Sequence, residues 1–239
     1  MKRLIIFLLF LICSQVFATP YYVDQNATGN GSGSSWTNAS TTVVDLPWSS
    51  IKGGDTVYVS GGSDSTVYSA GHSGIASVNY IVSITAIGNP IVITKGREAG
   101  HNGDVYFDQK ESPMRSSGYS FQVNACHNIK LTNLIFTTEM ADGVDDYSSC
   151  LLFASSSNCI VDNCQIISNG STNGIWFDTS DSITVNNCTI TVLSNNLARG
   201  QDNIHTDYGN GGHTFTNNKF YNYGYNSYPH NDLIQFTYP

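Results

Sequence analysis

Short segments in which hydrophobic and polar residues alternate cover most of this chain, and polar turns separate them. Alternation with a period of two predicts half-buried β-strands. The segments recur as a block: the one at Leu151 returns 24 residues later at Ile175, and other copies lie at steps of 29 and 30. The first strand of successive copies carries the apolar residues Phe121, Leu151, Ile175, Ile204 and Ile234.

No single block has enough apolar surface to fold alone, so the blocks must stack and bury a shared core. A step of 24 to 31 residues with three strand-sized segments predicts an all-β fold, a right-handed parallel β-helix. One turn of each block holds an asparagine, which can adopt a left-handed conformation and hydrogen-bond its stacked neighbours. These asparagines are Asn133, Asn163, Asn187 and Asn217.

The segment before the regular blocks has its own pattern. It opens with Tyr21–Val23, continues through a Gly/Ser/Asn-rich stretch that ends at Trp36, and reaches Gly-Asp-Thr-Val-Tyr-Val at 54–59. This order resembles the entry segment of secreted right-handed β-helix proteins of the pectate-lyase-like superfamily. The resemblance implies the same solenoid fold and a cap over its first coil, supplied by residues 24–52, because a solenoid must cover its terminal hydrophobic face.

The domain organisation follows from these segments. Residues 1–18 have a basic start, an apolar stretch and a small-x-small site, which predict a cleaved signal peptide. Residues 19–239 are expected to form one β-helix domain. Within it we expect the cap and first strand over about 19–60, irregular early coils over about 61–118, and regular coils over 119–239. The sequence stops one strand into a new coil, so a truncated C-terminal end is expected.

The signal peptide and the charge balance limit location and partners. An exported chain is expected to be secreted or periplasmic. Removal of residues 1–18 takes away two of ten Lys/Arg and none of the 18 Asp/Glu, which leaves a formal charge of −10. Such an acidic chain is not expected to bind nucleic acid or a membrane. The sequence does not predict an oligomeric state.

Five cysteines remain after cleavage, an odd number that does not suit a disulfide-stapled scaffold. Cys164 and Cys188 occupy equivalent positions in adjacent blocks. We expect buried thiols that stack inside the solenoid, with a disulfide between coils as the alternative in an oxidising compartment. No Cys/His spacing suggests zinc.

Chemistry-bearing residues gather where the first strands of three blocks align. If Ile175, Ile204 and Ile234 point inward, alternation sends their neighbours outward in two columns. One column holds Trp176, His205 and Gln235; the next holds Asp178, Asp207 and Thr237; Asn173, Asp202 and Asp232 precede the strands. We call these two columns and the flanking residues the exposed strip.

An aromatic ring, a histidine and several carboxylates on one strip suit a glycan, since rings stack on sugars and carboxylates serve in acid–base chemistry or bind calcium. The placement of Asp202 and Asp232 before paired strands also resembles polygalacturonase-type glycoside hydrolases, although no Gly-His-Gly or Arg-x-Lys motif is present. The expected catalytic residues are Asp202, Asp232, His205, Asp207 and Arg199. The expected substrate-binding residues are Trp176, Asp178, Gln235, His230 and Lys219.

The exposed strip and the resemblance together predict a secreted protein that cleaves a polysaccharide, either as a lyase or as a glycoside hydrolase. A lyase needs a base and a cation that neutralises the uronate carboxylate, so calcium held by Asp202, Asp207 and Asp232 is the expected cofactor for that reaction. Two alternatives stay open: a non-catalytic glycan-binding or adhesin module, and a structural fragment of a larger enzyme.

Overall fold

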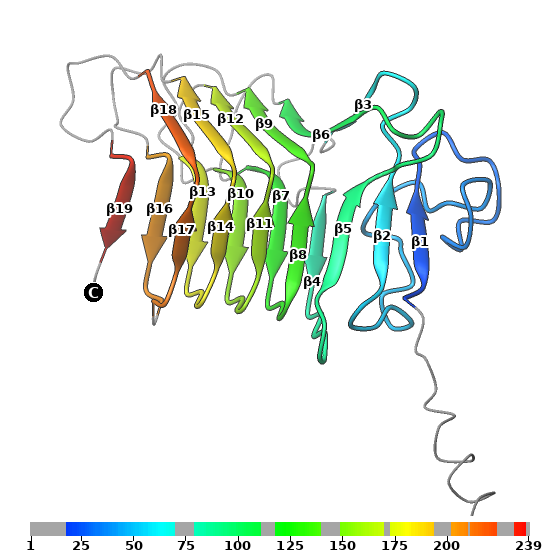
Figure 1. The fold of residues 1–239 in the computed structure, drawn as a ribbon, viewed down its shortest axis with the longest axis horizontal. Coiled ribbons are helices and arrows are strands. Elements are labelled where there is room, and N and C mark those ends of the chain that lie inside the picture. Colours follow the sequence, from blue (N-terminus) through cyan, green and yellow to red (C-terminus); the bar gives the residue numbers. More distant parts are fainter. Residues whose placement is uncertain are drawn as a thin grey trace, which may run out of the picture.

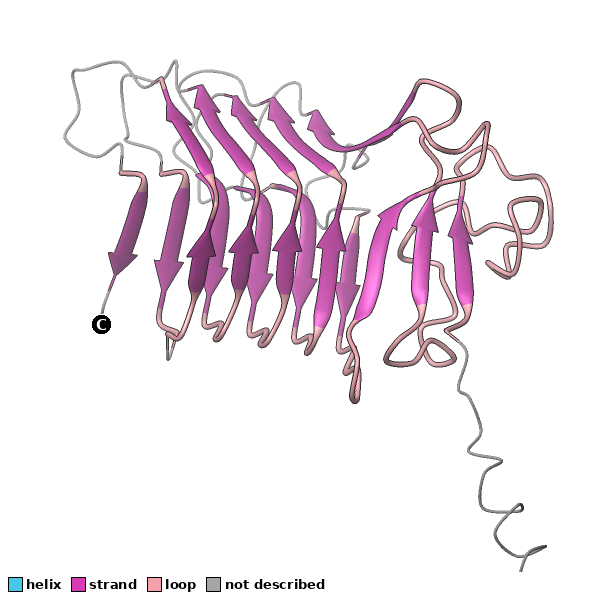
Figure 2. Cartoon of the chain, viewed as in Figure 1, coloured by secondary structure: helices cyan, strands magenta, loops and turns pink. Residues whose placement is uncertain are grey.

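The computed structural model describes residues 18–69, 79–110, 118–139, 149–169, 173–193, 202–209, 211–223 and 232–237, with only the backbone of Lys110, Glu139 and Thr237. Strands are the only regular elements in these ranges (Figure 2). Within the same ranges, no helix has the length and apolar character that crossing a membrane requires. Nearly all of the predicted signal peptide lies outside the described residues.

Three parallel sheets run along the molecule, from β1 at one end to β19 at the other (Figure 1). Sheet A contains β1 (Pro20–Val23), β2 (Thr56–Val59), β5 (Ile91–Lys95), β8 (Ile129–Thr132), β11 (Ile160–Asp162), β14 (Thr184–Asn186) and β17 (Thr214–Thr216). Sheet B contains β3 (Ser65–Ser69), β6 (Asp104–Lys110), β9 (Ile135–Glu139), β12 (Gln165–Asn169), β15 (Thr189–Leu193) and β18 (Lys219–Asn222). Sheet C contains β4 (Tyr80–Val82), β7 (Tyr119–Asn124), β10 (Ser149–Ala154), β13 (Asn173–Asp178), β16 (Ile204–Asp207) and β19 (Ile234–Thr237).

Each coil passes through sheets C, A and B in that order, and each strand pairs with its counterpart one coil away. Leu151 pairs with Ile175, and Ile175 pairs with Ile204. All three side chains are fully buried, so they form one interior file. The predicted all-β parallel β-helix is therefore confirmed, with the register that the sequence blocks predicted.

The interior is filled by apolar side chains that repeat from coil to coil. Phe153 and Phe177 are buried neighbours with ring centroids 5.8 Å apart. All five cysteines of residues 19–239 are buried free thiols, which confirms the thiol stack and not the disulfide. Burial raises the pKa of Cys126 to about 11 and that of Cys150 and Cys159 to about 12.

Residues between β1 and β2 cover the N-terminal end of the solenoid. Val43, Leu46 and Ile51 pack into the hydrophobic core from this segment. The Trp36 indole stacks on His101, with ring centroids 3.9 Å apart and an interplanar angle of 5°. This stacking attaches the cap to the loop between β5 and β6.

The early coils contribute strands to all three sheets. The described part of 61–118 contributes β3, β4, β5 and β6, and these strands pair in register with the later coils. The buried side chains of the interior continue here through Ile91, Ile93 and Phe107, beside the glycine-rich turns.

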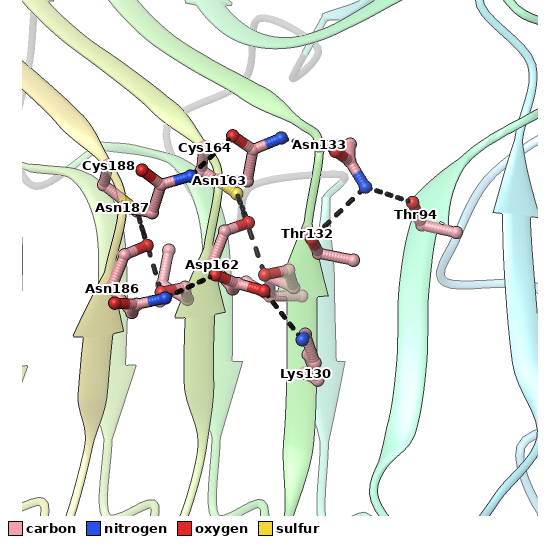
Figure 3. Close-up of polar contacts among 12 residues, drawn as sticks. Thr94, Lys130, Thr132, Asn133, Asp162, Asn163, Cys164, Asn186, Asn187 and Cys188 are labelled. Atoms are coloured by element: carbon pink, nitrogen blue, oxygen red, sulfur yellow. Dashed lines mark hydrogen bonds and ion pairs between the residues drawn. The ribbon is translucent and has the colours of Figure 1, made fainter. Parts of the chain in front are cut away.

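The repeated asparagines form a ladder at the turn between sheets A and B (Figure 3). Asn133, Asn163, Asn187 and Asn217 all have φ between 53° and 57°, a left-handed conformation. Asn163 Nδ2 donates to Asn133 Oδ1 at 2.6 Å, and Asn187 Nδ2 donates to Asn163 Oδ1 at 3.0 Å. From Asn133 to Asn187 the ladder therefore combines backbone conformation with side-chain hydrogen bonds between coils, as predicted. Asn217 Nδ2 donates instead to Asn186 Oδ1, at 3.4 Å.

We expect Asn163→Ala to lower the free energy of unfolding by roughly 2–3 kcal/mol, since it removes two hydrogen bonds and alanine tolerates the left-handed region less well than asparagine. Chemical denaturation followed by circular dichroism measures this change. Asn163→Gly, which adopts the same φ without strain, should recover part of the loss. Equal stability of wild type and the alanine variant would show that the ladder contributes nothing.

Candidate functional site

The exposed strip is built from β13, β16 and β19, three neighbouring strands of sheet C. Trp176 pairs with His205, and His205 pairs with Gln235. In the second column Asp178 pairs with Asp207. Because their inward neighbours Ile175, Phe177 and Ile204 are buried, these outward side chains lie on the outer face of the sheet, as the alternation predicted.

A histidine held between two carboxylates forms the centre of the strip. His205 Nδ1 lies 3.0 Å from Asp202 Oδ2, and His205 Nε2 lies 3.1 Å from Asp207 Oδ1. The other oxygen of Asp207 accepts a 3.0 Å hydrogen bond from Trp176 Nε1. Both ring nitrogens thus face acceptors, which suits a doubly protonated imidazolium.

The balance of burial and charge sets the protonation of His205. Burial lowers its pKa, but hydrogen bonds and charge interactions with Asp202 and Asp207 raise it, and the net result is a pKa above the ordinary 6.5. The side chain of His205 is 15% exposed, so a small part of it contacts solvent. The two carboxylates therefore favour the protonated form of His205 relative to a free histidine.

Asp202 is a positioning group in this arrangement. Its side chain is 5% exposed. Its Oδ1 accepts a 3.1 Å hydrogen bond from the backbone N–H of Asp232, and its own N–H donates to Asn173 Oδ1 at 2.9 Å. Asp202 therefore joins three coils through its backbone N–H and its carboxylate, and it orients His205 through Oδ2.

The buried residue Asn203 fixes the start of β16. Its Nδ2 donates to the carbonyl oxygens of Ile190, 2.9 Å away in β15, and Tyr221, 3.0 Å away in β18. These bonds tie sheet C to sheet B directly beside Asp202. β16, which carries His205 and Asp207, is therefore held both by its two neighbouring strands in sheet C and by sheet B.

The remaining predicted residues fall into three groups. Asp178 and Gln235 lie on the strip, and Asp232 is exposed at the approach to β19. Lys219 does not reach the strip, because it begins β18 in sheet B. Arg199 and His230 lie outside the described residues.

The carboxylates of the strip do not fit a calcium site. In the described ranges, no group of three or more His, Cys, Asp or Glu side chains is arranged to hold a metal ion. Asp202 and Asp207 point their oxygens at the imidazole of His205. The histidine therefore occupies the position between carboxylates that a cation would need, and we assign no step to calcium.

Two aromatic residues near the strip were not predicted. The Tyr119 ring, at the start of β7, lies 6.4 Å from the Trp176 ring. Tyr208 follows Asp207 directly and is 66% exposed. The signal for Tyr208 is readable in the sequence: the equivalent turn position of earlier blocks holds the small residues Ala125, Ser155 and Thr179.

The pKa of a second histidine, His213, is shifted in the opposite direction from that of His205. The His213 ring packs on Phe177, with centroids 4.7 Å apart, and its Nδ1 lies 3.2 Å from the N–H of Ile183. Nδ1 therefore accepts a hydrogen bond and carries no proton. Burial lowers the pKa of His213, although Asp181 raises it in part.

The fold and the exposed strip define this chain as a parallel β-helix protein with an Asp–His–Asp cluster on one sheet. Among solved structures it is similar to the crystal structure of pectate lyase Pel9A, with a TM-score of 0.44 and 14% sequence identity. The match covers 82% of this chain and 56% of that chain, so this chain spans about half of that protein. No family model and no curated protein matches the sequence.

We expect Asp207→Asn to lower the pKa of His205, because the imidazolium loses one of its two carboxylates. Proton NMR titration of the ring measures the shift. Asp178→Asn, one coil away in the same column, is the matched control and should leave the titration nearly unchanged. Because the pKa is raised on folding, the stabilisation from His205 is full below about pH 6.5 and is lost as the pH rises through the raised value. An unchanged pKa in the Asp207 variant would contradict the ion pair.

His213 should act on stability with the opposite sign. Its pKa is lowered on folding, so its contribution is present above about pH 6.5 and is lost as the pH falls through the lowered value. We expect the stability difference between wild type and His213→Gln to shrink between about pH 7.5 and about pH 5, measured by urea denaturation. A difference that stays constant with pH would show that His213 titrates normally.

Proposed function

We propose that this chain is an exported carbohydrate-active protein that binds a polysaccharide along the exposed strip and cleaves it with proton transfer by His205. The Asp202–His205–Asp207 cluster beside Trp176 is the observation that carries this proposal. Export is supported by the basic, apolar and small-residue pattern of residues 1–18.

The arrangement contains a proton donor and carboxylates, the kinds of group that glycosidic bond hydrolysis uses. An acid must protonate the leaving oxygen, and a carboxylate must act on the other side of the reaction as base or nucleophile. The raised pKa of His205 favours its protonated form, which can donate a proton. Asp207 is the carboxylate beside it, and its orientation is set by the Trp176 indole N–H. Asp202, buried behind the ring, positions His205 and does not contact the substrate.

The charge of the strip favours a neutral polysaccharide over a uronate polymer. Its described charged side chains are those of Asp178, Asp202, Asp207, Asp232 and His205. A net negative surface repels a polyanion, and a lyase needs a cation to neutralise the uronate carboxylate. We therefore favour hydrolysis of a neutral chain, with a lyase as the alternative reaction.

Burial of the cluster favours a second candidate, a glycan-binding module without catalysis. The side chains of Asp202, His205 and Asp207 are 5%, 15% and 13% exposed, and they satisfy one another. Such a closed cluster also serves as a rigid support for a binding surface. In that case Trp176 and Gln235 contact the sugar and no bond is broken.

The test uses the mature chain with neutral polysaccharides and with polygalacturonate, each with calcium and with a chelator. We expect new reducing ends from a neutral polymer, and loss of this activity as the pH rises through the raised pKa of His205. His205→Gln and Asp207→Asn should each lower turnover by about 100-fold or more. Thr184→Ala, on the outer face of sheet A, is the control, and all variants should keep the β-sheet circular dichroism of wild type.

Each other outcome points to a different function. Ultraviolet absorbance of an unsaturated product from polygalacturonate with calcium would identify a lyase and reject hydrolysis. Saturable binding without cleavage by wild type would favour the binding module. Unchanged turnover of His205→Gln would remove the cluster from the chemistry.

A further inference from the structure

The turn that follows β16 carries a bulky residue in a conformation that side chains rarely adopt. Tyr208 has φ of 52°, and its ring is 66% exposed. The left-handed region is unfavourable for bulky residues, and such strain persists where the surrounding structure enforces it. A large exposed aromatic side chain gains little burial at this position, so packing does not explain its presence.

The other coils show what this turn position requires. The residues one to four coils earlier have the same left-handed backbone, with φ between 48° and 56°, and they carry small side chains. They are Ser83, Ala125, Ser155 and Thr179. The fold therefore needs the backbone conformation here and not the tyrosine.

The turn at Tyr208 is also longer by one residue. The offset between paired residues is 29 where Asp178 pairs with Asp207, and it rises to 30 where Asp181 pairs with Gly211. The extra residue therefore lies after Tyr208, the counterpart of Thr179, and before Gly211. Gly209 packs so closely on the previous coil that a Cβ atom would lie 2.2 Å from the carbonyl oxygen of Ser180.

We propose that Tyr208 is an aromatic sugar-binding subsite, whose exposed ring stacks on a pyranose ring of a neutral polysaccharide bound at the exposed strip. Two observations converge on it: backbone strain and an aromatic side chain left in solvent directly after Asp207. Aromatic rings present a large apolar face at low cost in conformational entropy, which suits the C–H face of a sugar. This inference rests on the proposed function, because the strip supplies the rest of the binding surface.

A strained binding residue predicts opposite effects on stability and binding. Tyr208→Gly relieves the left-handed strain, so its unfolding midpoint should equal or exceed that of wild type. The same change should weaken sugar binding by about tenfold, since it removes one aromatic contact. Tyr208→Trp should retain binding. A residue with a merely structural role would show the reverse on replacement, a loss of stability.

The experiment titrates the mature chain with cellohexaose, a neutral probe, and with hexagalacturonate, an acidic one, by isothermal calorimetry. Ser155→Gly is the matched control, because it makes the same backbone change at the same turn position two coils away. We expect the control to bind like wild type and Tyr208→Gly to bind about tenfold more weakly.

The outcomes separate the two proposals. Equal binding by wild type and Tyr208→Gly overturns the subsite and leaves the proposed function intact. A large loss of stability in Tyr208→Gly also overturns it, because the tyrosine would then be structural. Absence of binding to both probes, together with absence of cleavage in the polysaccharide assay, rejects the proposed function and the subsite with it.

Discussion

In-register pairing between successive coils is the constraint on which this structure depends. Each strand hydrogen-bonds to its counterpart one coil away, so a residue is fixed by neighbours that lie 24 to 42 positions distant in the chain. A shift of one residue in the pairing of two strands would turn their buried side chains, such as Leu151 or Ile175, to the outer face of the sheet. The asparagine ladder opposes such a slip at the turns, because each amide meets its partner only in the native register.

The same pairing brings the cluster together. Trp176 and His205 are 29 residues apart in sequence, yet they are direct neighbours in sheet C. Asp202 joins β13, β16 and the approach to β19 through its backbone and its carboxylate. The precise placement of an imidazole between two carboxylates therefore follows from the stacking of coils, and no separate scaffold is needed.

Most of the fold was predictable from the sequence, because the interior files repeat with a period that can be counted. The outward columns of the strip followed from the same alternation. The sequence could not predict that Asp202 is buried behind His205 and acts as a positioning group, since that depends on side-chain rotamers and on the N–H of Asp232. Lys219 was expected to bind substrate, but it lies in sheet B and not in sheet C with the strip. The order of the coils alone does not say which of the three sheets carries a given charged residue.

The extra residue after Asp207 has a consequence for how such a protein can vary. Although the turn is longer, β14 and β17 pair in register immediately after it. A change in the length of this turn is therefore absorbed locally and does not shift the register of the strands that follow it. Turns of this kind can therefore change in length or sequence while the buried interior stays the same, so the surface can diversify on a constant stacked framework.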